Sequence, residues 1–275
     1  MKRAQARRNP FAKLRYNAWR LALRVIAPIR PVFRLGLRVL MRRPEHVRGH
    51  VLPVNVRLQP TQQALSRDVL SHLIGRATVL AAMDECLCRR VGGCTDYPVD
   101  LGCLVMGDSV ERLHPGLGRR IDAQQALVLV DRALACGLQP LVMHAMPDEL
   151  LWSLDFEGMV TVCFCCPCCC FVQQAMGPQR HPVVSHGVTA LPGVAALVDA
   201  GRCMGCGHCE RVCFLGAIAV GDGVATIDAQ KCVACGRCAA VCPAHAIAVT
   251  APEPYDAQPV LEIYRRRTGG RVFPG

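Results

Sequence analysis

Two copies of one cysteine pattern constrain this 275-residue chain more than any other feature. Each copy has the spacing C-x2-C-x2-C-x3-C, with Cys203, Cys206, Cys209 and Cys213 in the first and Cys232, Cys235, Cys238 and Cys242 in the second. In this spacing, three cysteines of a copy hold one cubane cluster and the fourth ligates the other cluster. We therefore predict one [4Fe-4S] cluster on Cys203, Cys206, Cys209 and Cys242, and a second on Cys232, Cys235, Cys238 and Cys213.

Residues 194–251 resemble the bacterial two-cluster ferredoxins. Small residues separate the cysteines and let backbone amides approach the sulfides: Gly205, Gly207, Ala234 and Gly236. An apolar run follows each copy at the same offset, at 217–220 and 246–249, so the segment is an internal repeat. The resemblance implies a pseudo-twofold pair of small helices and strands.

One residue departs from the ferredoxin pattern. Phe214 stands where the family usually has proline, whereas the second copy keeps Pro243. The neighbouring Cys213 is unchanged, so we expect an altered loop geometry rather than a lost ligand.

Zinc knots and disulfides are the alternative explanations for so many cysteines. Zinc needs four ligands per ion and does not explain a duplicated triplet with one added cysteine. Disulfides require an oxidising compartment, and the total of 19 cysteines is odd. A reducing cytoplasm is therefore the expected location.

The positive charge is confined to an N-terminal arm. Residues 1–48 carry fourteen Lys or Arg and one acidic residue, Glu45, a net charge of +13. The remainder has 18 basic and 20 acidic residues, a net charge of −2. The body of the protein is thus close to neutral.

Residues 1–50 are predicted to form a basic amphipathic arm of two helices, interrupted by Pro28 and Pro31. Its arginines recur among apolar residues at four-residue intervals in two runs, the first of Arg20 and Arg24 and the second of Arg30, Arg34, Arg38 and Arg42. This pattern favours binding to an anionic membrane surface through residues 1–48. Docking on a partner protein is the alternative, and nucleic acid is not expected, because phosphates do not need the interleaved Leu and Val. No stretch of the arm is apolar enough to span a bilayer.

Ten further cysteines form two groups upstream of the ferredoxin-like segment. Cys86, Cys88, Cys94 and Cys103 lie in a glycine-rich loop, where Arg89 and Arg90 would offset thiolate charge. Six more fall within eight residues: Cys163, Cys165, Cys166, Cys168, Cys169 and Cys170. Together they are candidate ligands of a third centre, an iron–sulfur cluster rather than zinc, built jointly by the loop and the run.

The run from 163 to 170 has a predicted internal geometry. In an extended chain Cys163, Cys165 and Cys169 share one face, and Cys166, Cys168 and Cys170 share the other. Pro167 would bend the run so that both sets converge. Adjacent cysteines seldom ligate the same tetrahedral ion, so the run favours a multi-iron cluster or two sites over one zinc.

The residues between these groups read as an ordinary α/β scaffold. Asp122 and Gln125 form a predicted capping box for a helix that ends near Gly137. Strands are predicted at 141–144 and 159–162. We expect His144 and Cys136 to be packing residues rather than ligands.

The predicted fold is α/β or α+β. It comprises the arm (1–50), a cysteine-rich domain (51–180) that resembles the front half of some ferredoxin-fused iron–sulfur proteins, a linker (181–193), the ferredoxin-like domain (194–251) and a tail (252–275). Pro252, Pro254 and Pro259 are expected to discourage regular structure in the tail.

The predicted function is electron transfer by a cytoplasmic protein that is peripheral to the inner face of the membrane and serves a redox partner protein. The alternative is an oxidoreductase: a reductase whose upstream cluster binds a substrate and receives electrons from the ferredoxin-like domain. Abundant thiolates favour the carrier, because a substrate-binding iron needs an open position.

Overall fold

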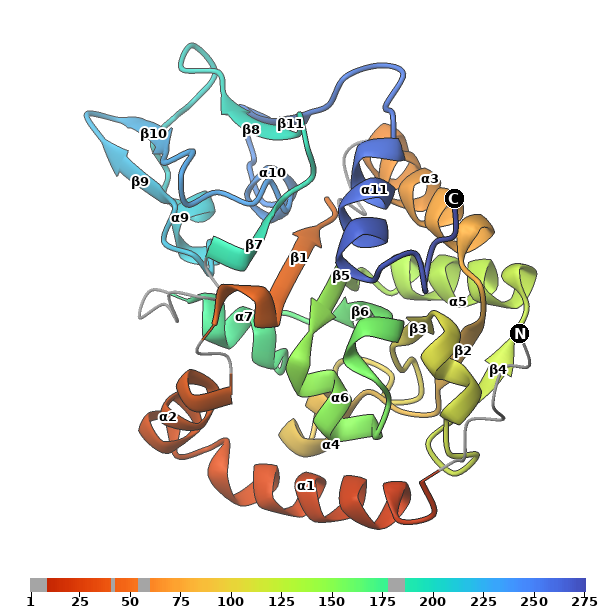
Figure 1. The fold of residues 1–275 in the computed structure, drawn as a ribbon. Coiled ribbons are helices and arrows are strands. Elements are labelled where there is room, and N and C mark those ends of the chain that lie inside the picture. Colours follow the sequence, from red (N-terminus) through yellow and green to blue (C-terminus); the bar gives the residue numbers. More distant parts are fainter. Residues whose placement is uncertain (1–8, 41–42, 54–59, 178–185) are drawn as a thin grey trace.

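The structure, a computed structural model, describes residues 9–40, 43–53, 60–177 and 186–275. It is a mixed α/β fold in which a cysteine-rich sheet domain precedes a small ferredoxin-like domain (Figure 1). The predicted fold class is confirmed.

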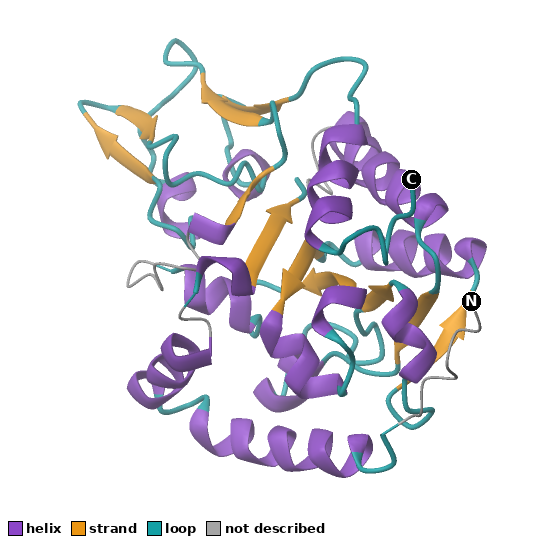
Figure 2. Cartoon of the chain, in the orientation of Figure 1, coloured by secondary structure: helices purple, strands orange, loops and turns teal. Residues whose placement is uncertain are grey.

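A seven-stranded sheet runs through the centre of the molecule, between helices on its two faces (Figure 2). Its strand order is β4-β2-β3-β6-β5-β1-β7. The strands are β1 (Val47–Val51), β2 (Leu80–Met83), β3 (Leu104–Met106), β4 (Gly118–Ile121), β5 (Gln139–Ala145), β6 (Val160–Cys165) and β7 (Val188–Ala190). Neighbouring strands are antiparallel except β1 and β7, which are parallel. The strands predicted at 141–144 and 159–162 lie within β5 and β6.

Side chains alternate between the two faces of this sheet, as the pleat of a strand requires. Val142 and Val162 belong to a core that includes helices α3 (Pro60–Arg76), α5 (Ala123–Ala135) and α11 (Gln258–Arg267). Leu141 and Met143 point the other way. The second face is covered by α1 (Ala12–Ile26), α4 (Leu87–Gly92), α6 (Met146–Trp152) and α7 (Phe171–Met176). Short 3-10 helices connect these elements at Pro44–His46, Asp108–Arg112 and Phe156–Gly158.

Helix α5 starts as predicted. Asp122 accepts a hydrogen bond from the Gln125 backbone N–H, and the Gln125 side chain accepts one from the Asp122 N–H. This reciprocal pair satisfies two backbone donors that the first turn of a helix leaves without partners.

The tail is ordered, and the expectation that its prolines prevent regular structure is wrong. It contains α11, whose Val260, Leu261 and Tyr264 are buried against the sheet. The Tyr264 hydroxyl donates to the Val142 carbonyl at 3.1 Å. Pro259 lies in the first turn of α11, where a helix needs no backbone N–H donor, so it starts the helix instead of breaking it.

Part of the predicted linker belongs to the sheet. Residues 178–185 lie outside the described part of the chain, but β7 pairs with β1 from Val188 to Ala190. The chain therefore reaches the ferredoxin-like domain directly from a sheet edge.

The arm forms two helices, α1 and α2 (Arg30–Leu40), separated near Pro28 as predicted. Pro31 does not interrupt the arm but lies in the first turn of α2, where a helix needs no backbone N–H donor. Helix α1 packs beside α4 and α6, where the Tyr16 hydroxyl donates to the Glu85 carboxylate at 3.0 Å. Phe33 of α2 packs against Phe171 of α7 with the two rings tilted by 55° and their centroids 5.1 Å apart. The arm is thus docked along one side of the sheet domain (Figure 1).

The ferredoxin-like domain consists of two strand pairs and two short helices. Strand β8 (Ala195–Val198) pairs with β11 (Ile247–Thr250), and β9 (Ile218–Gly221) pairs with β10 (Val224–Ile227). The helices are α9 (His208–Val212) and α10 (Arg237–Ala240). The two apolar runs of the repeat form β9 and β11, so the repeat in sequence is a repeat in structure.

Candidate metal centres

The first cluster set predicted from spacing lines one small cavity. Cys203, Cys206, Cys209 and Cys242 all border it, together with Gly205 and Gly207. Cys242 comes from the second copy of the motif, so the cavity joins cysteines from both copies. Thiols converging on one space are what a cluster with four thiolate ligands requires.

The four cysteines of the second set also lie close together, on the side of the ferredoxin-like domain that is nearer the sheet domain. Cys238 is buried, and it interacts electrostatically with Cys235, Cys232 and Cys213. Burial, followed by these neighbouring thiols, raises the pKa of Cys238. Crowded buried thiols resist ionisation unless a cation compensates them, and metal binding supplies that cation.

Backbone amides approach the sulfurs in a pattern that follows the repeat. Ala217 donates to the Cys213 sulfur and Ala246 to the Cys242 sulfur, each at 3.3 Å. Two further donations run from Ala225 to Cys203 at 3.4 Å and from Ala234 to Cys232 at 3.3 Å. Such hydrogen bonds stabilise negative charge on sulfur.

The small residues between the cluster cysteines are required by the backbone conformation and by close neighbouring atoms. Gly205 has a φ of +64°, and a Cβ there would lie 2.6 Å from the Gly223 carbonyl oxygen. Ala234, its counterpart in the second copy, also has a positive φ of +48°. The loop therefore adopts the left-handed conformation in both copies.

The second set faces the sheet domain. Val233 is buried in the same core as Cys165 and Cys170. The Gln139 side chain donates to the Cys235 carbonyl at 3.1 Å, and Arg237 donates to Gln173 at 2.8 Å.

Phe214 belongs to this contact. Its ring lies under the Arg237 guanidinium at 5.0 Å and packs against the core that contains Val233. The departure from proline thus adds packing area to the domain contact, while Cys213 keeps its place beside the other three thiols.

The ten upstream cysteines divide into two groups rather than converging on one site. The outer group is Cys94, Cys166, Cys168 and Cys169. The inner group is Cys86, Cys88, Cys103, Cys163, Cys165 and Cys170, linked by successive pair interactions. Each group takes cysteines from both the 86–103 loop and the 163–170 run.

The alternation of β6 explains this division. Cys165 joins the core on the second face of the sheet, and Cys166 joins the core on the first. The predicted assignment of cysteines to the two faces was partly wrong. Cys169 lies with Cys166 and not with Cys165, and Cys170 lies with Cys165 and not with Cys166. The strand ends at Cys165, so the turn through Pro167 breaks the period-two pattern that the prediction extended.

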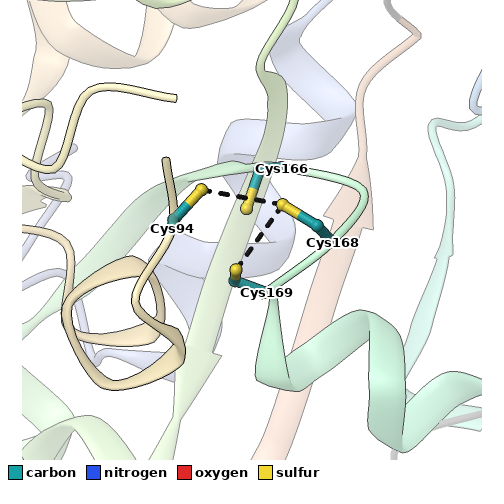
Figure 3. Close-up of side chains that lie close together, drawn as sticks. All are labelled: Cys94, Cys166, Cys168 and Cys169. Atoms are coloured by element: carbon teal, nitrogen blue, oxygen red, sulfur yellow. Dashed lines mark hydrogen bonds between the residues drawn. The ribbon is translucent and has the colours of Figure 1, made fainter. Parts of the chain in front are cut away.

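The outer group is compact (Figure 3). Its four Sγ atoms all lie within 4.8 Å of one another, with Cys94 and Cys168 at 3.6 Å and Cys168 and Cys169 at 3.5 Å. The expectation that adjacent cysteines diverge does not hold for Cys168 and Cys169, because they lie in the turn that precedes α7. Cys166 and Cys169 are buried, and Cys168 is exposed.

The inner group is more spread out and borders an apolar cavity of about 150 Å³. Sγ atoms of Cys165 and Cys170 are 3.1 Å apart, and those of Cys103 and Cys163 are 3.8 Å apart. The thiols of this group that line the cavity are Cys86, Cys88, Cys103 and Cys163. The arm closes the cavity with Trp19, Leu23 and Phe33.

Arg89 lies among both groups and is completely buried. Its guanidinium donates to the carbonyls of Phe164 and Leu101, whereas its Nε has no hydrogen-bonding partner among the described residues. Burial opposes its charge, but interactions with the thiols of Cys86, Cys166 and Cys103 outweigh burial and raise the pKa of Arg89. Arg90, expected to share this role, instead binds the Glu85 carboxylate at 2.6 Å.

Asp148 is a cavity residue that the sequence analysis missed. It lines the apolar cavity, accepts a hydrogen bond from the Thr161 hydroxyl at 2.9 Å, and has its pKa raised to about 7 by burial. An acid in the first turn of α6 reads in sequence as an ordinary helix-start residue, so nothing signalled its burial.

His144 and Cys136 lie apart from these groups. Both ring nitrogens of His144 have partners, the Phe156 carbonyl at 3.0 Å and the Arg267 Nε at 3.3 Å. This agrees with a packing role for His144. Cys136 is exposed at the end of α5, so its predicted packing role is wrong.

The comparisons with known proteins cover only the ferredoxin-like part. No curated protein and no solved structure matches the chain. The family model of the 4Fe-4S dicluster domain matches residues 194–247. The chain thus carries a 4Fe-4S dicluster domain behind a cysteine-rich α/β domain with a cluster-like thiol site, which indicates an iron–sulfur electron-transfer protein.

Proposed function

We propose that this protein is a membrane-peripheral electron carrier with two [4Fe-4S] clusters and a third iron–sulfur centre. Cys203, Cys206, Cys209 and Cys242 hold the first cluster, and Cys232, Cys235, Cys238 and Cys213 hold the second. The third centre lies on the inner group. The proposal depends on one hydrophobic core that contains Val233, Cys165 and Cys170. Through this core the loop that carries Cys232 and Cys235 lies next to the inner group.

When bound, these clusters supply reversible one-electron transfer. The chain contributes the thiolates, the backbone donors at Ala217, Ala225, Ala234 and Ala246, and a dry environment around Cys238. The first set lies toward solvent, where Cys206 and Met204 are exposed. A redox partner protein would therefore exchange electrons at that end, and the inner group would lie at the other.

The outer surface of the arm supports membrane binding. Large apolar side chains are exposed along both of its helices and at their ends: Phe11, Leu14, Leu21, Val25, Ile29, Val32, Leu35 and Val39. Arg15 and Arg20 of α1 face the body, at Glu149 and Glu85, so the apolar side of α1 is left outward. An apolar face on a segment of net charge +13 suits an anionic bilayer surface at the inner face of the membrane. No helix among the described residues is long and apolar enough to cross a membrane.

Metal and sulfide analysis of anaerobically purified protein tests the clusters. Two cubanes contribute about eight irons and eight sulfides per chain. We expect clearly more than this of both, because the inner group adds a cluster. A count of about eight irons with matching sulfide would refute the third iron–sulfur centre and leave the two cubanes intact.

Vesicle flotation tests the arm. Leu21→Glu combined with Val25→Glu should abolish binding to vesicles of mixed neutral and anionic phospholipid, since both side chains would have to enter the acyl region as charges. The matched control is Leu197→Glu with Val241→Glu, two exposed apolar residues on the ferredoxin-like domain. Equal loss of flotation in both variants would contradict insertion of the arm. It would mean that the two added negative charges weaken vesicle binding wherever they are placed.

The apolar cavity favours a second function, that of a reductase whose substrate binds beside the inner group. Its wall combines thiols, Asp148 and the aromatic side chains of Trp19 and Trp152. A cavity of about 150 Å³ accepts a ligand of about one aromatic ring, by comparison with an engineered cavity of that size. Toluene added to the reduced protein should then change the electron paramagnetic resonance spectrum of the third centre, whereas a carrier alone gives an unchanged spectrum.

A further inference from the structure

We propose that the outer group, Cys94, Cys166, Cys168 and Cys169, binds a single tetrahedral divalent ion, Zn²⁺ or Fe²⁺. This centre is separate from the three iron–sulfur centres proposed above and differs from them in containing one metal and no sulfide. The proposal does not depend on the third cluster, because the two sites use different cysteines.

The spacing of the sulfur atoms carries the assignment (Figure 3). A tetrahedral ion with metal–sulfur distances of about 2.3 Å holds its sulfurs about 3.8 Å apart. The observed separations of 3.6 Å and 3.5 Å are close to that value, and all four atoms lie within 4.8 Å of one another. In a cluster each thiolate binds a different iron, which spreads the sulfurs further.

The other thiols of the described chain show this contrast. No second group of three or more Cys, His, Asp or Glu ligand atoms in the described ranges lies within 4.8 Å of one another. The ferredoxin-like cysteines and the inner group are therefore more widely spaced as sets, as clusters require. Within the described part of the chain, only the outer group has the dimensions of a one-ion site.

The chain brings the four ligands together from separate elements. Cys94 follows α4, Cys166 follows β6, and Cys168 and Cys169 lie in the turn before α7. Gly92 eases the approach, because a Cβ at that position would lie 3.0 Å from the Cys169 sulfur and crowd it. The site thus joins the 86–103 loop to the 163–170 run.

Charge provides a second, independent observation. Four thiolates and a divalent ion carry a net charge of −2, which a buried site must compensate. Arg89 is completely buried, has no carboxylate partner among the residues that the structure describes, and interacts with Cys166. A buried guanidinium without a carboxylate needs an anionic neighbour, and metal-bound thiolates meet that need.

The position of the site indicates what the ion does. Pro167, between two of the ligands, lines a cavity of about 650 Å³ together with Tyr97, Arg237 and Cys235. This cavity lies between the turn and the ferredoxin-like domain. An ion on the outer group would hold the turn in place and so position the surface against which the second cluster loop docks.

Metal analysis of paired variants tests the proposal. Cys94→Ser with Cys168→Ser should lose one metal ion per chain and no sulfide. Zinc loss identifies Zn²⁺, and loss of one iron without sulfide identifies Fe²⁺. The comparison variant, Cys103→Ser with Cys163→Ser in the inner group, should lose iron and sulfide together and keep the single ion. Cys136→Ser, at an exposed thiol outside both groups, should lose neither.

Two results would overturn the assignment. Loss of sulfide along with iron in the Cys94→Ser, Cys168→Ser variant would show that the outer group holds a cluster. An unchanged metal content would show that it binds nothing. In either case the Cys103→Ser, Cys163→Ser variant still shows whether the inner group holds a cluster of its own.

A measurement on the unaltered protein covers the case in which the variant does not fold. Cys168 is exposed, so a chelator should remove one ion while the visible absorption of the clusters persists. Alkylation followed by mass spectrometry should then find Cys94 and Cys168 newly modified. Modification of these residues to the same extent before chelation would contradict a bound ion.

Discussion

The ferredoxin-like domain and the sheet domain both gather cysteines, but by different means. In the ferredoxin-like domain the thiols come from two copies of one local motif, and each copy completes the set of the other. In the sheet domain a loop and the end of β6 supply them, and strand alternation sorts them into the inner and outer groups. A local motif can be recognised in sequence, whereas sorting by a strand depends on where that strand ends.

The two regions also compensate thiolate charge differently. The ferredoxin-like domain uses backbone N–H groups, such as those of Ala217 and Ala246, at equivalent places in the repeat. The sheet domain uses one buried side chain, Arg89, between two groups. Backbone donors survive most substitutions, whereas a single guanidinium does not, so the sheet domain should be the more easily damaged.

The largest expected effect tests the exchange of ligands between the two motifs. Cys242→Ala should remove the cluster held by Cys203, Cys206 and Cys209, because Cys242 borders their cavity. About four irons per chain should be lost, and the remaining spectrum should match that of Cys206→Ala. A spectrum that instead matches Cys235→Ala would mean that each motif holds its own cluster.

The second prediction concerns the buried charge of the sheet domain. Arg89→Leu leaves two groups of thiolates without their cation and should destabilise the protein by about 3–5 kcal/mol. Upstream metal should be lost while the two ferredoxin-like clusters remain. Arg90→Leu removes only an ion pair that is half exposed, so its thermal midpoint should stay near that of the wild type. Similar losses in both variants would contradict the special role of Arg89.

The smallest expected effect lies at the contact between the two regions. Phe214→Pro restores the usual ferredoxin residue but removes the ring beneath Arg237, at a cost of about 1 kcal/mol. The thermal midpoint should fall by a few degrees, by roughly 2–4 °C per kcal/mol, and cluster content should not change. Phe214→Leu keeps apolar volume and should lose less. A loss of iron in Phe214→Pro would show that the ring supports the cluster and not the domain contact.

Much of the fold was predictable where a signal is local. The capping box at Asp122 and Gln125, the interruption of the arm near Pro28 and the cores of β5 and β6 depend on neighbouring residues in the chain. The tail was predicted wrongly because Pro259 breaks a helix in its middle but not in its first turn. Only the packing of Tyr264 on the sheet makes that distinction visible.

For the metal centres, the sequence alone determined the residue type, the duplicated spacing and therefore the 4Fe-4S character of residues 194–247, since a local loop dictates where its own thiols can converge. Tertiary structure decided which upstream cysteines lie together. That choice depends on β6 ending at Cys165, on Gly92 admitting Cys169 and on Arg89 being buried between the groups. These are contacts between segments distant in sequence, and spacing along the chain carries no information about them.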